Sequence, residues 1–248
     1  MVFSIARKEL KSMFASPMGW IILAVMMGIF GNYFANGVTN YLDVASGAIR
    51  PAERIGLTQF VSQTVYGAAS FVMLFAVPLL SMRLIAEERR SQTLPFLFSA
   101  PLSITEIVLG KFAGLLGFLS ILIVYIALTL STLNLWSDID FGYIIANSVG
   151  LFLLVASFCA LGLYFSSVTT QPIVAGILSF VALFVLMMLD RFFGGDPTSI
   201  IANFSLLKHF GSFASGLIDT ADVAFFLLFV ITFLTLTIRR LDADRLRG

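Results

Sequence analysis

One apolar stretch decides the fold: YIIANSVGLFLLVASFCALGLYF, residues Tyr143–Phe165. As a helix rising about 1.5 Å per residue, it is long enough to cross a hydrocarbon core of about 30 Å. Five further stretches share this length and apolar character: Met18–Ala35, Val65–Met82, Phe112–Leu133, Ile173–Leu189 and Val223–Ile238. None of the 15 Lys and Arg or 14 Asp and Glu residues falls inside any of them. A charge at mid-membrane costs several kcal/mol, so this exclusion predicts six transmembrane helices.

The composition agrees with a single membrane domain. The chain is 59% hydrophobic and 12% charged, with a mean hydropathy of +0.99, whereas globular domains are about 25% charged. Six crossings use most of residues 1–248 and leave no room for a separate soluble catalytic domain of about 100 residues. The net charge of +1 and the lack of basic runs alternating with aromatics exclude a nucleic-acid partner. The expected fold is an all-α integral membrane protein whose surroundings are the lipid bilayer.

The distribution of Lys and Arg predicts the orientation, because cytoplasmic loops retain cations. If both termini are cytoplasmic, eleven cations lie inside: Arg7, Lys8, Lys11, Arg83, Arg89, Arg90, Lys111, Arg239, Arg240, Arg245 and Arg247. Four then lie outside: Arg50, Arg54, Arg191 and Lys208. This bias predicts a multi-pass protein of the bacterial cytoplasmic (inner) membrane with both termini in the cytoplasm.

The N-terminal segment, residues 1–16, has the pattern of an amphipathic helix. Apolar residues recur at helical spacing at Phe3, Ala6, Leu10, Met13 and Phe14. The cations Arg7, Lys8 and Lys11 occupy the other side, so we expect them to anchor the helix at the membrane surface, beside anionic lipid. Pro17 then marks the bend into the first crossing. The alternative is a frayed basic tail.

The outer segment, residues 190–222, is too apolar for an aqueous loop. It carries Ile200, Ile201, Phe204, Leu206, Leu207, Phe210, Phe213, Leu217 and Ile218 among Gly and Ser residues. We therefore expect short re-entrant or interfacial helices before the last crossing. His209 is interpreted as a surface or interfacial residue, and the acids Asp190 and Asp222 as solvated helix ends.

The loop between the second and third crossings, residues 83–105, carries a family resemblance. The chain reads SMRLIAEERRSQTLPFLFSAP over Ser81–Pro101 and LGKF over Leu109–Phe112. A paired acid, basic residues, a small residue and Thr, an apolar stretch ending in Pro, and then Gly-Lys at the next helix resemble the ABC-2 family of ABC-transporter permeases. Lys208-His209-Phe210 and Gly216–Asp219 look most like the gliding-motility type, the GldF-like permeases. Two departures are Gln92, where the family usually has Gly, and Pro95, which breaks a helix.

In this loop a charged segment, Glu87–Arg90, precedes an apolar segment that water would leave uncovered. This combination suits docking into a groove on another protein. The charged segment can continue the second transmembrane helix past the membrane surface as a coupling helix. The docking candidates are Glu87, Glu88, Arg89, Arg90, Thr93, Leu94, Phe96 and Leu97. The alternative is a loop whose charges only enforce topology and whose aromatics lie on lipid.

The resemblance implies specific partners. The groove would belong to a cytoplasmic ABC ATPase subunit, which would bind ATP and Mg. A second copy of the permease (a homodimer) and an accessory membrane-anchored substrate-binding-like protein are further expected partners. The implied function is export coupled to ATP hydrolysis, in gliding motility or secretion. The permease of a copper-enzyme maturation transporter is an alternative, although the lone Cys159 and His209 weigh against direct copper handling.

The chain lacks the motifs of an enzyme. Its Gly110-Lys111 has Thr105 in place of the first Gly of a P-loop and is followed by Phe112, so ATP must be hydrolysed by a partner. A single histidine cannot build a multi-histidine metal site, and we expect neither metal nor cofactor in this chain. Ser120 and Thr129 lack a His or acidic partner for intramembrane catalysis. A scaffold that anchors a motility or secretion assembly without moving cargo remains the alternative from another class.

Overall fold

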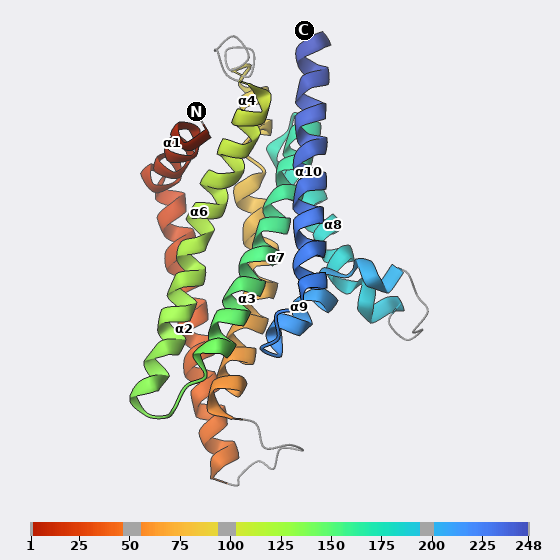
Figure 1. Ribbon diagram of the computed structural model, residues 1–248. Helices are drawn as coiled ribbons and strands as arrows, with labels where there is room; N and C mark the ends of the chain where they lie inside the picture. The colour runs from red at the N-terminus through yellow and green to blue at the C-terminus, as the bar shows by residue number, and fades with distance from the viewer. Residues whose placement is uncertain (1, 47–55, 94–102, 194–200, 248) are drawn as a thin grey trace.

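The computed structural model describes residues 2–46, 56–93, 103–193 and 201–247, and within these ranges every regular element is a helix. Six helices are long and apolar enough to cross a membrane, which confirms the predicted fold class. They are α2 (Pro17–Ala45), α3 (Leu57–Ser81), α6 (Ile104–Ser131), α7 (Phe141–Val168), α8 (Pro172–Phe193) and α10 (Thr220–Arg247). Figure 1 shows both chain termini at one end of the bundle, here called the terminal end. The other end is called the opposite end.

Local sequence signals fix where the long helices begin. Ser103 and Glu106 form a capping box at the start of α6, in which each side chain accepts a hydrogen bond from the other residue's backbone N–H. Asp140 caps α7 by accepting from the Tyr143 N–H at 3.1 Å. Pro172 is the first residue of α8, where its missing N–H costs nothing.

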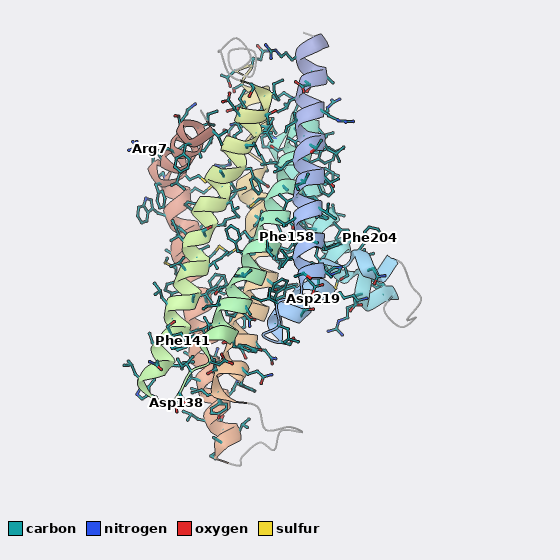
Figure 2. All side chains as sticks on the ribbon, viewed as in Figure 1. Arg7, Asp138, Phe141, Phe158, Phe204 and Asp219 are labelled. Carbon is teal, nitrogen blue, oxygen red and sulfur yellow. The ribbon has the colours of Figure 1, made fainter. Side chains whose placement is uncertain are left out.

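Helix α7, the apolar stretch that decided the fold, lies at the centre of the bundle. Its most apolar window is 72% buried, against 22% for α2 and for α10. It packs against α3, α6, α8 and α10. Phe158 and Cys159 are fully buried, and Figure 2 shows Phe158 in the middle of the bundle. Cys159 is therefore a packing residue of the central helix.

The N-terminal helix α1 (Val2–Ala15) lies along α6 rather than apart from the bundle. A Cβ on Gly110 would lie 2.6 Å from the Ile5 Cβ, and one on Gly114 would lie 2.8 Å from the Glu9 Cβ. The two glycines, spaced by four, therefore form the surface on which α1 packs. The predicted apolar face is divided, because Ala6 and Leu10 are partly buried whereas Phe3 is 90% exposed.

The bend into the first crossing lies where the sequence predicts it. Ser16 is the N-cap of α2, its Oγ accepts from the Met18 N–H at 3.3 Å, and Pro17 is the first helical residue. The indole Nε1 of Trp20 donates to the Phe14 carbonyl oxygen at 2.8 Å across this bend. The angle between α1 and α2 is thus held by a hydrogen bond as well as by proline.

Short helices cover the opposite end, as the apolar outer segment predicts. Two of them lie in that segment, the 3₁₀ helix η2 (Ile201–Phe204) and the α-helix α9 (Leu206–Ala214), and a third, the 3₁₀ helix η1 (Thr132–Leu135), follows α6 outside it. Leu206, Phe210 and Phe213 of α9 are buried against α7 and α8. In Figure 1, α2 and the α6–α7 connection project further at this end than α9 does. The part of the predicted segment at 194–200 lies outside the described residues.

Candidate functional site

At the terminal end, the chain turns sharply between α3 and a short helix, α4 (Ala86–Arg90). The sequence allows Glu87–Arg90 to continue the second transmembrane helix; in the structure a turn at residues 82–85 separates α3 from α4. The buried Ser166 of α7 stabilises the break. Its Oγ accepts from the backbone N–H groups of Ile85 at 3.1 Å and Ala86 at 3.0 Å, and it donates to the Met82 carbonyl oxygen at 3.0 Å. A side chain from the central helix therefore supplies the cap that α4 itself lacks.

A buried lysine joins α4 to two other helices. Lys111, in the second turn of α6, is 2% exposed. Its Nζ donates to Glu9 Oε1 of α1 at 3.0 Å and to Glu88 Oε1 of α4 at 2.6 Å. Burial of an unpaired ammonium group would cost several kcal/mol, so the two carboxylates are what allow a lysine at this position. The three residues tie α1, α4 and α6 together.

Arg89, which follows Glu88 in α4, forms an ion pair with a different helix. Arg89 Nη2 donates to Asp244 Oδ2 near the C-terminal end of α10. Asp244 Oδ1 also lies 3.8 Å from Arg240 Nη2, one turn earlier on the same helix. We call Glu9, Glu88, Arg89, Lys111 and Asp244 the ion-pair cluster. Through two consecutive side chains, α4 contacts α6 and α10 directly, and through Lys111 it is linked to α1.

The predicted docking residues separate into three groups. Glu88 and Arg89 face the bundle, as members of the ion-pair cluster. Glu87, Arg90 and Thr93 are exposed and could meet a partner. Leu94, Phe96 and Leu97 lie outside the described residues, as does Pro95. Docking of the exposed residues stays a prediction.

The end of α4 gives a physical reason for the glycine that the family usually has where this chain has Gln92. The Thr93 N–H donates to the Glu88 carbonyl oxygen at 3.0 Å and the Gln92 N–H to the Arg89 carbonyl oxygen at 3.2 Å. These two bonds are those of a Schellman motif, whose penultimate position requires a left-handed backbone. Gln92 occupies that position with φ of 55°. Glycine adopts this conformation without strain, which is a physical reason for a glycine there.

The three basic residues of α1 point away from the packed face. Arg7, Lys8 and Lys11 are exposed, and Figure 2 shows Arg7 at the edge of the bundle. Within the described residues they form no ion pair. Anchoring to the membrane surface stays a prediction.

A cleft of about 390 Å³ lies between the α1–α2 bend, the end of α3, α4 and α6. We call it the terminal cleft. Its lining contains Lys8, Arg83, Glu87 and the ion pairs of Lys111, together with apolar side chains such as Leu79. The cleft is thus amphipathic, with charges from α1, the α3–α4 turn, α4 and α6 beside apolar side chains.

Sequence reasoning missed several residues of this site. It assigned Lys111 only to topology and the Gly-Lys pattern, and it did not single out Glu9, Asp244 or Ser166. A signal existed for Glu9, which borders the apolar stripe of α1 beside Ala6 and Met13 rather than lying among its cations. No sequence signal pairs Arg89 with Asp244, because 155 residues separate them.

The opposite end has its own polar cluster, centred on His209 of α9. Its Nδ1 lies 2.6 Å from Asp222 Oδ1 of α10, and its Nε2 lies 2.8 Å from the Asn203 carbonyl oxygen. The ring stacks on Phe225 with centroids 3.9 Å apart. A carbonyl only accepts, so Nε2 carries a hydrogen, and the bond at Nδ1 requires a second proton shared with Asp222. Asp222 is 8% exposed, so its interpretation as a solvated helix end is wrong.

Packing completes the attachment of α9. The Tyr143 hydroxyl of α7 donates to the Ala214 carbonyl oxygen. The Phe213 ring sits so close to Gly150 that a Cβ there would lie 2.6 Å from the Phe213 Cγ. Helix α9 ends in a second Schellman motif, with Gly216 at φ of 83° in the left-handed position. We call these contacts, with the His209 cluster, the α9 clasp.

Comparison with known proteins agrees with the architecture. The family model described as ABC-2 family transporter protein matches residues 3–213, which is most of the chain. No curated protein matches the sequence. The match includes Glu9, Glu88, Arg89, Lys111 and His209, whereas Asp222 and Asp244 of α10 lie beyond it.

Proposed function

Because the chain belongs to the ABC-2 family of transporter proteins, we propose that it is a permease that works as a homodimer with a separate cytoplasmic ABC ATPase. ATP and Mg are then bound by the ATPase, and this chain supplies the membrane pathway. The helices cross the inner membrane of a bacterial cell, and the terminal end faces the cytoplasm. The bias of Lys and Arg toward that side supports this orientation.

One observation carries the proposal: α4 connects exposed charges to three parts of the bundle. Glu87 and Arg90 face solvent, while the neighbouring Glu88 and Arg89 hold α1, α6 and α10 through the ion-pair cluster. A five-residue helix held in this way moves as a unit with the ends of those helices. A force that an ATPase applies to the exposed face of α4 is therefore transmitted to several transmembrane helices at once.

The finer assignment concerns the biological process. We propose gliding motility or secretion as the setting and export as the direction. The inner-loop sequence and the Lys208–Phe210 motif support this assignment through their likeness to gliding-type permeases. An ATPase gene and a gene for a large membrane-anchored accessory protein beside this one would support it further. An adjoining set of copper-enzyme maturation genes would contradict it.

Co-purification with the ATPase encoded next to this chain tests the proposal. Charge reversal of the exposed pair, Glu87→Lys with Arg90→Glu, is expected to weaken association at least about ten-fold, because interface charges meet like charges. The matched control is Asp138→Lys, an exposed acid at the opposite end, which should leave association unchanged. Undiminished association of the double variant would contradict docking at α4. A complex that hydrolyses ATP in proteoliposomes but moves no cargo would favour a scaffold.

A further inference from the structure

Helix α2 carries two exposed carboxamides inside its membrane span. Asn32 and Asn36 lie one turn apart, and both side chains are exposed. When α2 enters the hydrocarbon core at the bend before Pro17, a rise of ~1.5 Å per residue places Asn32 about 22 Å into a core of about 30 Å, and Asn36 about 28 Å into it. Asn32 therefore lies within the apolar layer, and Asn36 lies near its outer boundary.

The two carboxamides satisfy each other only in part. The Asn36 Nδ2 donates to the Asn32 Oδ1 at 2.8 Å. Neither side chain forms a further hydrogen bond with a described residue. Both hydrogens of the Asn32 Nδ2 and the lone pairs of the Asn36 Oδ1 are thus without a described partner. Lipid chains cannot supply one, so the carboxamides require a polar partner from outside this copy of the chain.

Exposed hydroxyl groups in another span differ in this respect. Thr232 and Thr235 of α10 are exposed, and each hydroxyl donates to a carbonyl oxygen one turn earlier in the same helix at 2.7 Å. Such hydroxyls are satisfied by their own helix and can face lipid. The carboxamides of α2 have no equivalent bond to their own backbone, which makes the α2 face a candidate contact surface.

The surface around the carboxamides allows a second helix to approach closely. Ala24 and Gly28 precede Asn32 at intervals of four residues, and all three are exposed on one face of α2. A Cβ added to Gly28 would have no atom within 4 Å. Beside this face, a hollow of about 860 Å³ between α2 and α3 is lined by both carboxamides and by apolar side chains such as Phe71. Small residues next to polar side chains are typical of contacts between helices in membranes.

The polar pair is complementary to a copy of itself. In a dimer whose twofold axis lies along the membrane normal, the two α2 helices run in the same direction and present the same face. A contact from residue 32 of one copy to residue 36 of the other then occurs twice. The Asn32 Nδ2 supplies donors and the Asn36 Oδ1 supplies an acceptor, so the two copies can form two equivalent hydrogen bonds. A second copy therefore satisfies both carboxamides within the apolar layer.

We propose that the exposed face of α2 at Gly28, Asn32 and Asn36 is the surface on which the two copies of the permease meet. The Asn32 Nδ2 of each copy donates to the Asn36 Oδ1 of the other, and the second α2 fills the hollow beside Phe71. The inference rests on the proposed homodimer and adds the place of its contact. The contact lies in the half of the membrane nearer the opposite end, so it leaves the α4 helices of the two copies apart from it.

Disulfide cross-linking of two differently tagged copies tests the register of the contact. One copy carries Asn32→Cys and the other Asn36→Cys, a combination that removes one of the two reciprocal hydrogen bonds and keeps the other. The native Cys159 is fully buried and does not interfere. Oxidation in native membranes should link these copies to each other, because the two cysteines lie within disulfide range. The control combines Leu228→Cys with Ile231→Cys, two exposed positions on α10, and should give no linked dimer.

The strength of association gives a second test. Energy transfer between donor-labelled and acceptor-labelled copies, followed on dilution in detergent, measures the Kd of the dimer. Asn32→Leu removes the donor of both hydrogen bonds and should raise this Kd about ten-fold. The matched control Thr235→Leu replaces an exposed polar side chain that is satisfied within α10 and should leave the Kd unchanged. Gly28→Leu should also raise the Kd by holding the helices apart, whereas Gly211→Leu in α9, equally free of neighbours, should not.

The outcomes separate this inference from the proposed function. A dimer in which the α2 cysteines are not linked overturns the α2 contact and leaves the homodimer in place. Labelling of Asn32→Cys by a membrane-impermeant maleimide overturns it as well, because the carboxamides then line a water-filled path. A chain that stays monomeric both alone and with its ATPase contradicts the proposed homodimer itself.

Discussion

The two ends of the bundle are fastened by different kinds of interaction. At the terminal end, the ion-pair cluster joins four helices through charged side chains that are in part exposed. At the opposite end, the α9 clasp combines a His209–Asp222 pair, in which Asp222 is buried, with close packing, in which Phe213 meets Gly150 and Tyr143 bonds to Ala214. Each end therefore resists a different perturbation.

This contrast indicates which end of the molecule can change shape. The Arg89–Asp244 pair between α4 and α10 is partly exposed, and such pairs are weakened by salt and can be exchanged for pairs with another protein at little cost. A ring packed against a glycine cannot leave without opening a cavity, and a buried polar pair cannot part without losing its hydrogen bonds. We infer that the contact between α4 and α10 at the terminal end is the adjustable one and that the α9 clasp keeps the opposite end fixed.

The largest effect is expected from removing the centre of the ion-pair cluster. Lys111→Met leaves Glu9 and Glu88 facing each other in a nearly buried site with no cation between them. Breaking such a pair costs about 3–5 kcal/mol, so we expect the free energy of unfolding to fall by roughly that amount. Unfolding by SDS titration of the protein in mixed micelles measures it.

A matched control separates burial from charge. Lys11→Met removes an exposed lysine from the same end of the bundle and should change the free energy of unfolding by less than about 0.5 kcal/mol. The same small effect for both variants would mean that the ion-pair cluster does not stabilise the folded protein. Restoring stability in Lys111→Met by Glu88→Gln with Glu9→Gln would confirm that repulsion between the carboxylates is the cause.

The clasp should respond next most strongly. Asp222→Ala removes the partner of His209 Nδ1 and leaves the imidazole stacked on Phe225 without its short hydrogen bond. Bonds to charged groups contribute about 1.5–3 kcal/mol, so we expect a loss of ~2 kcal/mol in the same unfolding measurement. The control is Asp138→Ala, an exposed acid that Figure 2 places at the tip of the opposite end. An equal response of the two acids would show that the pair is not buried in the working protein.

The sequence predicts the parts of this molecule that depend on local or compositional signals. The exclusion of charge from apolar stretches located all six long helices, and Pro17 located the bend after α1. The apolar surplus of the outer segment predicted the short helices at the opposite end. These features follow from the cost of burying charge and from backbone chemistry, which can be read from a single segment.

Contacts between distant segments could not be read in the same way. Ser166 breaks the helix at residues 82–85 by bonding to backbone groups about 80 positions earlier, and Asp222 is buried because α9 folds back over it. Glu88 and Arg89 looked like outward docking residues because their partners, Lys111 and Asp244, lie on other helices. A charged run in sequence does not say which of its members face the bundle, and that depends on the packing.

A smaller effect is expected from the second arm of the ion-pair cluster. A double-mutant cycle with Arg89→Gln and Asp244→Asn should give a coupling energy of about 1 kcal/mol, because the pair is partly exposed. The coupling should decrease between 0.1 M and 1 M salt, since the screening length falls from about 10 Å to about 3 Å. The control cycle pairs Asp244→Asn with Arg239→Gln, an exposed arginine that has no ion pair with a described residue, and should give no coupling. A coupling energy that does not change with salt would show that the pair is shielded from solvent and is not adjustable.

The smallest effect compares two helix ends that share one geometry. Both α4 and α9 finish in a Schellman motif, but the left-handed position holds Gln92 in one and Gly216 in the other. A side chain in this conformation costs about 1 kcal/mol, and glycine loses part of that gain to the entropy of the unfolded chain. Gln92→Gly should therefore stabilise the protein by about 0.5 kcal/mol and slow hydrogen exchange at the Gln92 and Thr93 amides, while Gln92→Ala should not. Gly216→Ala should destabilise, because its Cβ would also meet the Tyr143 ring at 2.5 Å. If Gln92→Gly instead loosens α4, the strain at this turn is not what the backbone angle indicates.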